Sequence, residues 1–289
     1  MNKAIAFIRL ARPHHYIKNG LVLVPVFFAH RLTDPNALFP AVAGFVGFCL
    51  AASAVYVFND IVDAKADASH PLREDRPLAA GVITNREARL FLMMFLGLTL
   101  VGCLWLGSAV YCLVLLGYII LNGLYSLKFK KIPVVDVFCL AAGFLLRIFA
   151  GAAVIRVPVS PWLAGLTLSL ALFLGFAKRR CDMDICEPAG GNQVAAGYHR
   201  GLLTVLIIGL ALITAVGYTL YTISPAVIRE HATSRLYWTI PWVVLGMVRY
   251  LWIVFVRQSW CYPVTALLRD HWLQLTVLGW IVTLWLMIY

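Results

Sequence analysis

The sequence predicts an all-α polytopic membrane protein, and three observations support this fold class. Hydrophobic residues make up 62% of the 289 positions and charged residues only 13%, with a mean hydropathy of +0.86, a composition outside the range of soluble domains. The apolar residues form runs long enough to cross a hydrocarbon core of about 30 Å as helices. The basic residues gather in alternate connections between these runs, as they do in membrane proteins of fixed orientation.

Nine apolar runs are expected to form spanning helices, and we assign them to a single domain of residues 1–289. Charged or loop-forming residues separate them, such as the Pro and Ser residues at 157–161 and the Pro and Gly residues at 187–192. The first run is shorter than the others. The runs lie at residues 17–30, 37–58, 88–107, 108–128, 133–155, 160–178, 200–222, 238–256 and 272–289.

The distribution of charge orients the chain. With nine spans, eighteen lysines and arginines fall on one side of the membrane and four on the other. This excess marks the cytoplasmic side, so the N-terminus is predicted to be cytoplasmic and the C-terminus to lie outside. Eleven of the 13 acidic residues fall on the cytoplasmic side as well. Because topology requires only the basic residues there, the carboxylates indicate that this face carries the chemistry.

The net charge of +11 and the pI near 9.5 do not indicate a nucleic-acid-binding protein. The basic residues are divided among short loops between spans instead of forming one surface. Attraction to the head groups of anionic membrane lipids and to anionic substrates explains them better.

A cluster of acids directly follows the run at 37–58. Asp60, Asp63 and Asp67 have the spacing i, i+3, i+7, which places them on one face of a helix. Carboxylate oxygens on a rigid helix end suit Mg²⁺, which is commonly shared between one or two carboxylates and the phosphates of a substrate. A solvated helix end with salt bridges is the alternative, but Asn59 and Asp60 still border the membrane, where acids without partners are costly. We therefore predict the three aspartates as metal ligands and catalytic residues.

Basic side chains follow the acids in the same loop. Arg73 and Arg76 lie within reach of substrate phosphates and can bind them in a bidentate manner. His70 is the one histidine next to the acids. The histidines that border spans, His14 and His15 among them, need no special role.

Two further polar groups occur at span ends. Tyr125, Ser126, Lys130 and Asp136 resemble part of a polar cavity, with Lys130 as a phosphate ligand, although three lysines at 128–131 also fit a plain positive-inside boundary.

At the end of the sixth span, a basic triplet adjoins three acids, Asp182, Asp184 and Glu187. Either a second metal site or a diphosphate clamp is compatible with this pattern, and we favour a clamp by Lys178 and Arg179. Arg147 and Arg249 fall inside spans, where a charged side chain should face a cavity or an acid partner.

These residues resemble a known family. The pattern Asn-Asp-x-x-Asp-x-x-x-Asp after the second span is similar to the first acidic motif of the UbiA superfamily of intramembrane prenyltransferases, and within it the chain most resembles the decaprenyl-phosphate phosphoribosyltransferases. The matching points cover nearly the whole chain and are jointly specific. They are Arg12-Pro13 with Lys18-Asn19, Asn59 to Asp67, His70-Pro71 with Arg76-Pro77 and Ala79-Ala80-Gly81, Tyr125-Ser126 with Lys130 and Asp136, Leu146-Arg147 with Ala150-Gly151, Pro158 with Ser160-Pro161-Trp162, Ala177 to Arg180, Arg249-Tyr250, and Leu268 to Asp270.

The resemblance implies nine helices around a central cavity with a cytoplasmic polar cap, in the inner membrane of a bacterium. It implies Mg²⁺-dependent transfer of the phosphoribosyl group from phosphoribosyl diphosphate to a polyprenyl phosphate. A step of this kind supplies cell wall biosynthesis. Assembly of the chain into a homo-oligomer is compatible with the resemblance. Arg12 and Lys18 are the candidates for holding the lipid phosphate. The remaining substrate-binding candidates are Asn59, His70, Arg73, Arg76, Tyr125, Lys130, Asp136, Arg147, Lys178 and Arg179.

Two other functions remain open from the sequence. Prenyl transfer from a polyprenyl diphosphate to an aromatic or lipid acceptor would use the same metal chemistry, but it predicts two complete acidic motifs, whereas the second motif here is largely basic. A membrane transporter would place ionisable residues near mid-membrane and show paired broken helices, whereas these acids gather at one face.

Overall fold

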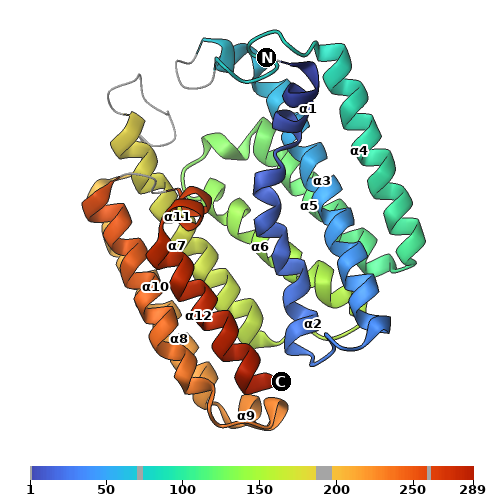
Figure 1. Ribbon diagram of the computed structural model, residues 1–289. Helices are drawn as coiled ribbons and strands as arrows, with labels where there is room; N and C mark the ends of the chain where they lie inside the picture. The colour runs from blue at the N-terminus through green and yellow to red at the C-terminus, as the bar shows by residue number, and fades with distance from the viewer. Residues whose placement is uncertain (1, 70–73, 187–196, 259–261) are drawn as a thin grey trace. The chain divides into compact units, whose positions relative to one another are not determined.

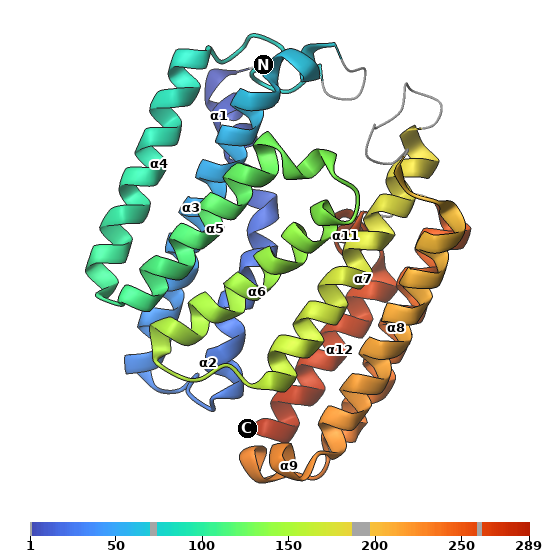
Figure 2. The same ribbon diagram turned by 180° about the vertical axis from the view of Figure 1, so that it is seen from behind.

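The computed structural model describes residues 2–69, 74–186, 197–258 and 262–289, with the backbone alone at 184–186. All regular elements within these ranges are helical (Figures 1 and 2), so the predicted all-α class is confirmed. The chain forms two compact units, Met1–Val159 and Ser160–Tyr289. The assignment of residues 1–289 to one domain stays a prediction.

The first unit is built on the long helix α3. Asp34 caps its N-terminus by accepting from the backbone N–H of Asn36, and Pro35 occupies the first turn, where a missing N–H costs nothing. Thr84 and Glu87 form a reciprocal capping box that begins α4. The elements are α1 (Lys3–Ala11), the 3₁₀ helix η1 (Pro13–Leu23), α2 (Val24–Phe28), α3 (Pro35–Ala68), α4 (Asn85–Leu106), α5 (Ala109–Leu127), η2 (Phe129–Lys131) and α6 (Val135–Ile155).

Small residues let the elements of the first unit pack closely on α3. The main apolar core joins η1, α3, α5 and α6 around the fully buried Phe48 and Tyr111. Tyr111 donates its hydroxyl hydrogen to the carbonyl oxygen of Gly44 at 2.8 Å. At Gly151 of α6 an added Cβ would lie 2.0 Å from the carbonyl oxygen of Val22, so only glycine permits η1 to cross α6 there.

The N-terminal segment is not one continuous spanning helix. Arg12 adopts a left-handed conformation with φ 53°, and after this break the chain continues as the 3₁₀ helix η1 and the five-residue α2. Figure 1 shows α1, η1 and α2 in series beside α3. The predicted helix at 17–30 is therefore wrong in its form: it is divided between η1 and α2.

The second unit consists of helices, and its long α-helices pack side by side (Figure 2). Two close approaches organise it: Trp242 lies against Gly279, where a Cβ would come within 2.7 Å of the indole ring, and its Nε1 donates to Thr283 at 3.0 Å. The elements are α7 (Pro161–Cys186), α8 (Arg200–Ile223), α9 (Pro225–His231), the 3₁₀ helix η5 (Leu236–Thr239), α10 (Ile240–Trp252), the π-helix η6 (Ile253–Arg257), α11 (Pro263–Arg269) and α12 (His271–Ile288).

Within the described ranges, 8 helices are long and apolar enough to cross a membrane. They correspond to the second to ninth predicted runs, so these eight predictions are confirmed and the count of nine is not. The largest difference in length is at α3, which continues ten residues beyond the predicted end at Phe58 to Ala68. This extension carries the acid cluster.

Candidate functional site

The three predicted acids lie on the last turns of α3. Asp60 and Asp67 are buried, each 3% exposed, and Asp63 is half-buried. Burial of a carboxylate requires a compensating partner. Each acid has one: a basic side chain from a different part of the first unit contacts each of them.

Arg12 is the partner of Asp60. Its Nη2 lies 2.5 Å from Asp60 Oδ1, and its guanidinium carbon lies 5.3 Å from the ring centre of Tyr56. Tyr56 and Asp60 are one helical turn apart on α3, so Arg12 lies along this turn. The left-handed break between α1 and η1 directs Arg12 there.

Arg76 connects two of the acids. Its Nη1 lies 2.5 Å from Asp67 Oδ2 and 3.5 Å from Asp60 Oδ1. The loop that follows is held by hydrogen bonds from Ala80 N–H to the Arg76 carbonyl at 2.8 Å and from Ile83 N–H to the Pro77 carbonyl at 3.1 Å. Side chains of the same loop are buried in the core between α1, α3 and α4. Arg76 is therefore fixed by packed neighbours.

Lys130 forms the third ion pair, between its Nζ and Asp63 Oδ1. Helix α5 ends at Leu127, and the 3₁₀ turn η2 carries Lys130 toward α3. The side chains of both partners are about one fifth exposed, 21% for Lys130 and 19% for Asp63. Asp63 is thus the most accessible of the three acids to a solute.

A cavity of about 550 Å³ adjoins the Asp60 side of the cluster. Asp60, Arg12 and Arg76 line it together with His14, and Arg9, His15 and Asp75 complete its polar wall. Burial, reinforced by the charges of Arg12 and Lys18, holds the pKa of His14 below its ordinary value. His14 is therefore neutral at neutral pH, and the fixed positive charge of the cavity comes from arginines.

The arrangement fits a divalent cation that is shared with substrate. Among the described residues no three His, Cys, Asp or Glu side chains form a metal cluster by themselves. However, Arg76 Nη1 lies 3.5 Å from one oxygen of Asp60 and 2.5 Å from one of Asp67, so these oxygens are at most 6.0 Å apart. Two carboxylates that converge on one cationic nitrogen suit Mg²⁺, which takes its other ligands from water and phosphates.

Four other predicted residues lie in the first unit. Asn59 is half-buried on α3 next to Asp60, and Lys18 is half-buried on η1. Tyr125 is half-buried in the last turn of α5, whereas Asp136 is fully buried in the first turn of α6. Their roles in binding substrate stay predictions.

Arg147 is buried inside the core of the first unit. It donates to Asn19 Oδ1 at 2.8 Å, to the carbonyl of Gly143 at 2.6 Å and to the Tyr118 hydroxyl at 3.3 Å, and its guanidinium lies 5.1 Å from the Phe48 ring centre. Among the described residues it contacts no carboxylate, so of the two expected surroundings, a cavity or an acid partner, the acid partner is not found there. Aromatic faces and neutral acceptors stabilise this charge instead.

The predicted clamp residues belong to the second unit. Arg179 is 4% exposed and donates through Nη1 to Asp182 Oδ2 at 2.6 Å, while the other oxygen of Asp182 accepts from the Tyr262 hydroxyl at 2.9 Å. Lys178 is half-buried beside it on α7. Asp182 is thus the structural partner of Arg179.

The sequence alone missed several residues of the cavity. His14 and His15 were assigned no role, although they line it together with Arg9 and Asp75. The signal was the short polar stretch around Pro13, which interrupts a helix before an apolar run. His70 and Arg73, two predicted substrate ligands, lie outside the described residues.

Fold and site together define a class of protein. The eight apolar helices of spanning length found in the described ranges make the chain an integral membrane protein. Buried carboxylates paired with basic side chains at the end of one span suit metal-assisted chemistry on phosphorylated substrates. The chain belongs to the UbiA prenyltransferase family, whose sequence profile matches residues 21–187. It is therefore an enzyme of that family.

Individual relatives refine the comparison. Over 197 residues the chain is 32% identical to the decaprenyl-phosphate phosphoribosyltransferase of Mycolicibacterium smegmatis, an alignment that covers 66% of this chain and 61% of that relative. The protein of the same name from Corynebacterium glutamicum is 27% identical over 302 residues, which cover 100% of this chain and 88% of that one. The chain thus spans about six tenths of the length of the first relative.

A solved structure supports the fold over both units. The structure of a UbiA homolog from Archaeoglobus fulgidus bound to GPP and Mg²⁺ has a TM-score of 0.73 and 22% sequence identity, and covers 98% of this chain and 99% of that one.

Proposed function

We propose that the protein transfers the 5-phosphoribosyl group of phosphoribosyl diphosphate to a polyprenyl phosphate of the decaprenyl type, releasing diphosphate in a Mg²⁺-dependent reaction. The C1–O bond between ribose and diphosphate breaks, and a phosphate oxygen of the lipid forms the new bond to C1. The names of the two relatives support this choice of substrates.

The observation that carries the proposal is the pairing of every acid on the α3 extension with a basic side chain. Arg12, Arg76 and Lys130 come from three separate segments and converge on Asp60, Asp63 and Asp67. Carboxylates alone would suit the binding of a metal ion, and cationic side chains alone would suit the binding of a phosphate. Their combination suits the binding of a diphosphate together with a divalent cation. It also suits a donor that carries a further phosphate.

Activation of the leaving group is the main catalytic effect that we assign to these residues. Asp60 and Asp67, with Asp63, would hold Mg²⁺, which supplies charge neutralisation of the diphosphate when it is bound. Arg76 and Lys130 would contact the phosphate oxygens on which charge grows as the C1–O bond breaks, and preorganised cations stabilise that state more than the ground state. Lys178 and Arg179 are proposed from the sequence pattern to assist in binding the diphosphate.

The acceptor needs less activation. A lipid phosphate is already an anion near neutral pH, so positioning it behind C1 is sufficient and no strong base is required. Arg12, at the break between α1 and η1, and Lys18, on η1, are proposed to hold it.

The same chemistry supports a location in the bacterial inner membrane with the site facing the cytoplasm. Phosphoribosyl diphosphate is water-soluble, and the ends of the spans that carry the acid cluster also carry most of the basic residues. The excess of positive charge on that side follows the positive-inside rule.

Purified protein with radiolabelled phosphoribosyl diphosphate, Mg²⁺ and polyprenyl phosphate tests the proposal. We expect a labelled lipid product that disappears with EDTA and in Asp60→Asn. Product formation only from a prenyl diphosphate and an aromatic acid would replace the proposal with prenyl transfer. Lipid-independent movement of a labelled solute across sealed vesicles, without product, would favour a transporter.

A further inference from the structure

One serine of α3 holds the break between α1 and η1. Ser53 is fully buried, and its Oγ donates to the carbonyl oxygen of Ala11 at 3.1 Å. The Tyr16 hydroxyl lies 2.6 Å from the same Oγ. Because a serine hydroxyl has a single hydrogen, Tyr16 is the donor in this second bond. Ser53 therefore connects α3 both with the last residue of α1 and with η1.

The Ala11 carbonyl lies at a position where such a bond matters. The last carbonyl groups of an α-helix lack partners within the helix. Ala11 ends α1 and is buried in the core between α1, α3 and α4. A buried carbonyl without a partner costs free energy. The bond from Ser53 satisfies this carbonyl and fixes the place where α1 ends.

The end of α1 determines the direction of Arg12. This residue follows Ala11 directly and adopts φ 53° and ψ 54°, a left-handed conformation that costs free energy for residues other than glycine. Such a conformation persists where the surrounding structure fixes it, and it is frequent at functional sites. From this position Arg12 pairs with Asp60 and lies over the ring of Tyr56. The place of the guanidinium thus depends on the contacts that hold the break.

These contacts follow one stripe of α3. Its members have the spacing i, i+4, i+7 and i+11, which places them on one face of the helix; they are Cys49, Ser53, Tyr56 and Asp60. At the first member, Asn19 Nδ2 of η1 donates to the sulfur at 3.3 Å. The last two members contact Arg12. Ser53 therefore lies between the anchor of η1 and the partners of the arginine.

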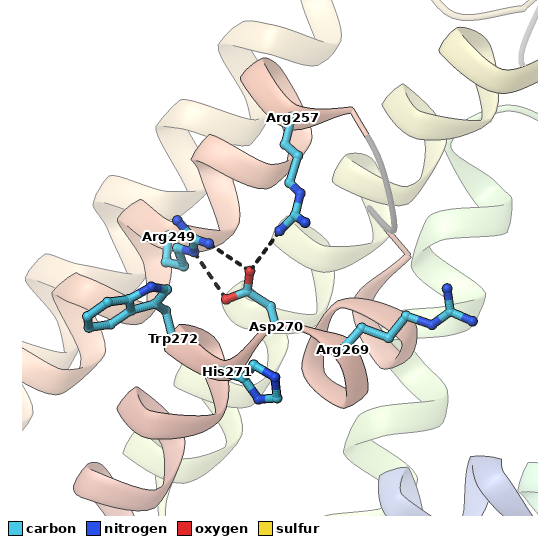
Figure 3. A pocket seen from close by; sticks show the side chains of 6 residues that line it. All are labelled: Arg249, Arg257, Arg269, Asp270, His271 and Trp272. Atoms are coloured by element: carbon cyan, nitrogen blue, oxygen red, sulfur yellow. Dashed lines mark hydrogen bonds and ion pairs between the residues drawn. The ribbon is translucent and has the colours of Figure 1, made fainter.

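Asp270 in the second unit combines the same two tasks (Figure 3). It caps α12 by accepting from the backbone N–H of Leu273 at 2.9 Å, and it accepts from Arg249 Nε at 3.1 Å and Nη2 at 2.8 Å. These bonds, chiefly those from Arg249, hold the pKa of Asp270 below its ordinary value. Arg249 thus has the acid partner expected of a charged residue inside a span. In both units a side chain that satisfies a helix end also fixes an arginine.

We infer that Ser53 is a positioning residue for the lipid acceptor: it directs Arg12 into the cavity at Asp60 by holding the Ala11 carbonyl and the Tyr16 hydroxyl. The inference rests on the proposed function, in which Arg12 holds the phosphate of the polyprenyl phosphate. Ser53 is buried and acts through Arg12 without contacting the substrate. Its loss should therefore weaken binding of the lipid phosphate only where Arg12 is present.

Binding of polyprenyl phosphate to the full-length protein in detergent tests the inference, measured by native mass spectrometry without phosphoribosyl diphosphate. Ser53→Ala should weaken binding about tenfold in the parent, the loss expected for one charge-assisted contact. In an Arg12→Gln background the same change should weaken binding less than twofold. Tyr16→Phe keeps the ring and removes one hydroxyl, so it provides the same test if Ser53→Ala folds poorly.

Ser169→Ala is the matched control. Ser169 on α7 also makes one donated and one accepted bond, to the carbonyl of Leu166 at 3.1 Å and from Thr214 Oγ1 at 3.1 Å. Its loss should leave lipid binding unchanged in both backgrounds. Equal losses from Ser53→Ala in the parent and in Arg12→Gln would overturn the inference. Unchanged binding in both Ser53→Ala and Tyr16→Phe would overturn it as well.

Thermal unfolding without lipid separates this inference from the proposed function. Ser53→Ala and Arg12→Gln should together lower the Tm by less than the sum of their separate shifts, because both disturb the same contact with Asp60. Additive shifts would overturn the positioning role. If the parent binds no polyprenyl phosphate while the shifts are non-additive, the proposed acceptor is refuted and the positioning of Arg12 by Ser53 is supported.

Discussion

Replacing Arg76 with Gln tests whether the two buried carboxylates of α3 need a shared cation. Arg76 Nη1 contacts both Asp60 and Asp67, whose side chains are each 4% exposed. Without it, the two charges face each other across at most 6.0 Å, the bound given by the two contact distances of 3.5 and 2.5 Å. Within the part of the chain that the structure describes, the ion pair from Arg12 to Asp60 then remains.

The expected cost follows from Coulomb's law. At an effective dielectric constant of about 20, two unit charges about 6 Å apart repel by about 3 kcal/mol. Loss of the charge-assisted bond to Asp67 adds a destabilisation of the same order. We therefore expect Arg76→Gln to lower the Tm by about 5–10 °C in EDTA. Excess Mg²⁺ should restore most of the loss, because a divalent cation can bind between the same oxygens.

Thermal unfolding of the detergent-purified protein measures this effect, with and without Mg²⁺. Arg89→Gln is the matched control, since that side chain is exposed and donates to the carbonyl of Asn85 in its own helix. Equal Tm values for the two variants in EDTA would refute the electrostatic reasoning. A low Tm of Arg76→Gln that Mg²⁺ does not raise would refute the metal assignment.

Four further predictions concern the remaining charged groups. Asp63→Asn should lower turnover at least about 100-fold with an unchanged yield of folded protein, and near-normal turnover would exclude it from the metal site. Lys130→Met should raise the donor KM about tenfold, whereas the exposed Lys131→Met should change it less than twofold. Because cationic neighbours contribute to the lowered pKa of His14, binding of an anionic donor should raise that pKa. Proton uptake and tighter binding below pH 7 should follow, detected by calorimetry in two buffers and absent in His14→Gln. The pKa of Asp270 is lowered, so its stabilising effect should be complete above the ordinary carboxylate pKa and vanish as the pH falls through the lower folded value. The difference in Tm between the parent and Asp270→Asn should therefore narrow below about pH 4.

Most of the fold follows from hydropathy, because each apolar run must bury its length in lipid. The runs at 88–107 and 133–155 match α4 and α6 within a few residues. The form of the segment at 17–30 cannot be predicted from hydropathy. An apolar run has the same hydropathy whether its backbone is an α-helix or a 3₁₀ helix. Its form depends on the left-handed Arg12 and on the close crossing at Gly151, and that crossing is a contact between segments far apart in the chain.

The acid cluster was predictable because its members are neighbours on one helix. The identity of their basic partners was not. Lys130 meets Asp63 across 67 residues and Arg12 meets Asp60 across 48, and nothing in the local pattern distinguishes Lys130 from Lys128 or Lys131. It is the 3₁₀ turn η2, which follows the end of α5, that places Lys130 beside Asp63.

The pairing of the α3 acids also bears on the order of binding. Asp60, Asp63 and Asp67 are matched by Arg12, Arg76 and Lys130, so the three pairs have no net charge. A divalent cation alone would have to compete with these basic side chains for the carboxylates. A diphosphate that arrives together with the cation instead gives the displaced side chains new anionic partners. Every carboxylate and every basic group then keeps a partner of opposite charge, and none is left buried alone at the high cost of an unpaired charge. The geometry therefore favours joint binding of metal and donor, and it predicts that Mg²⁺ affinity measured without diphosphate is weak in the parent and stronger in Arg76→Gln.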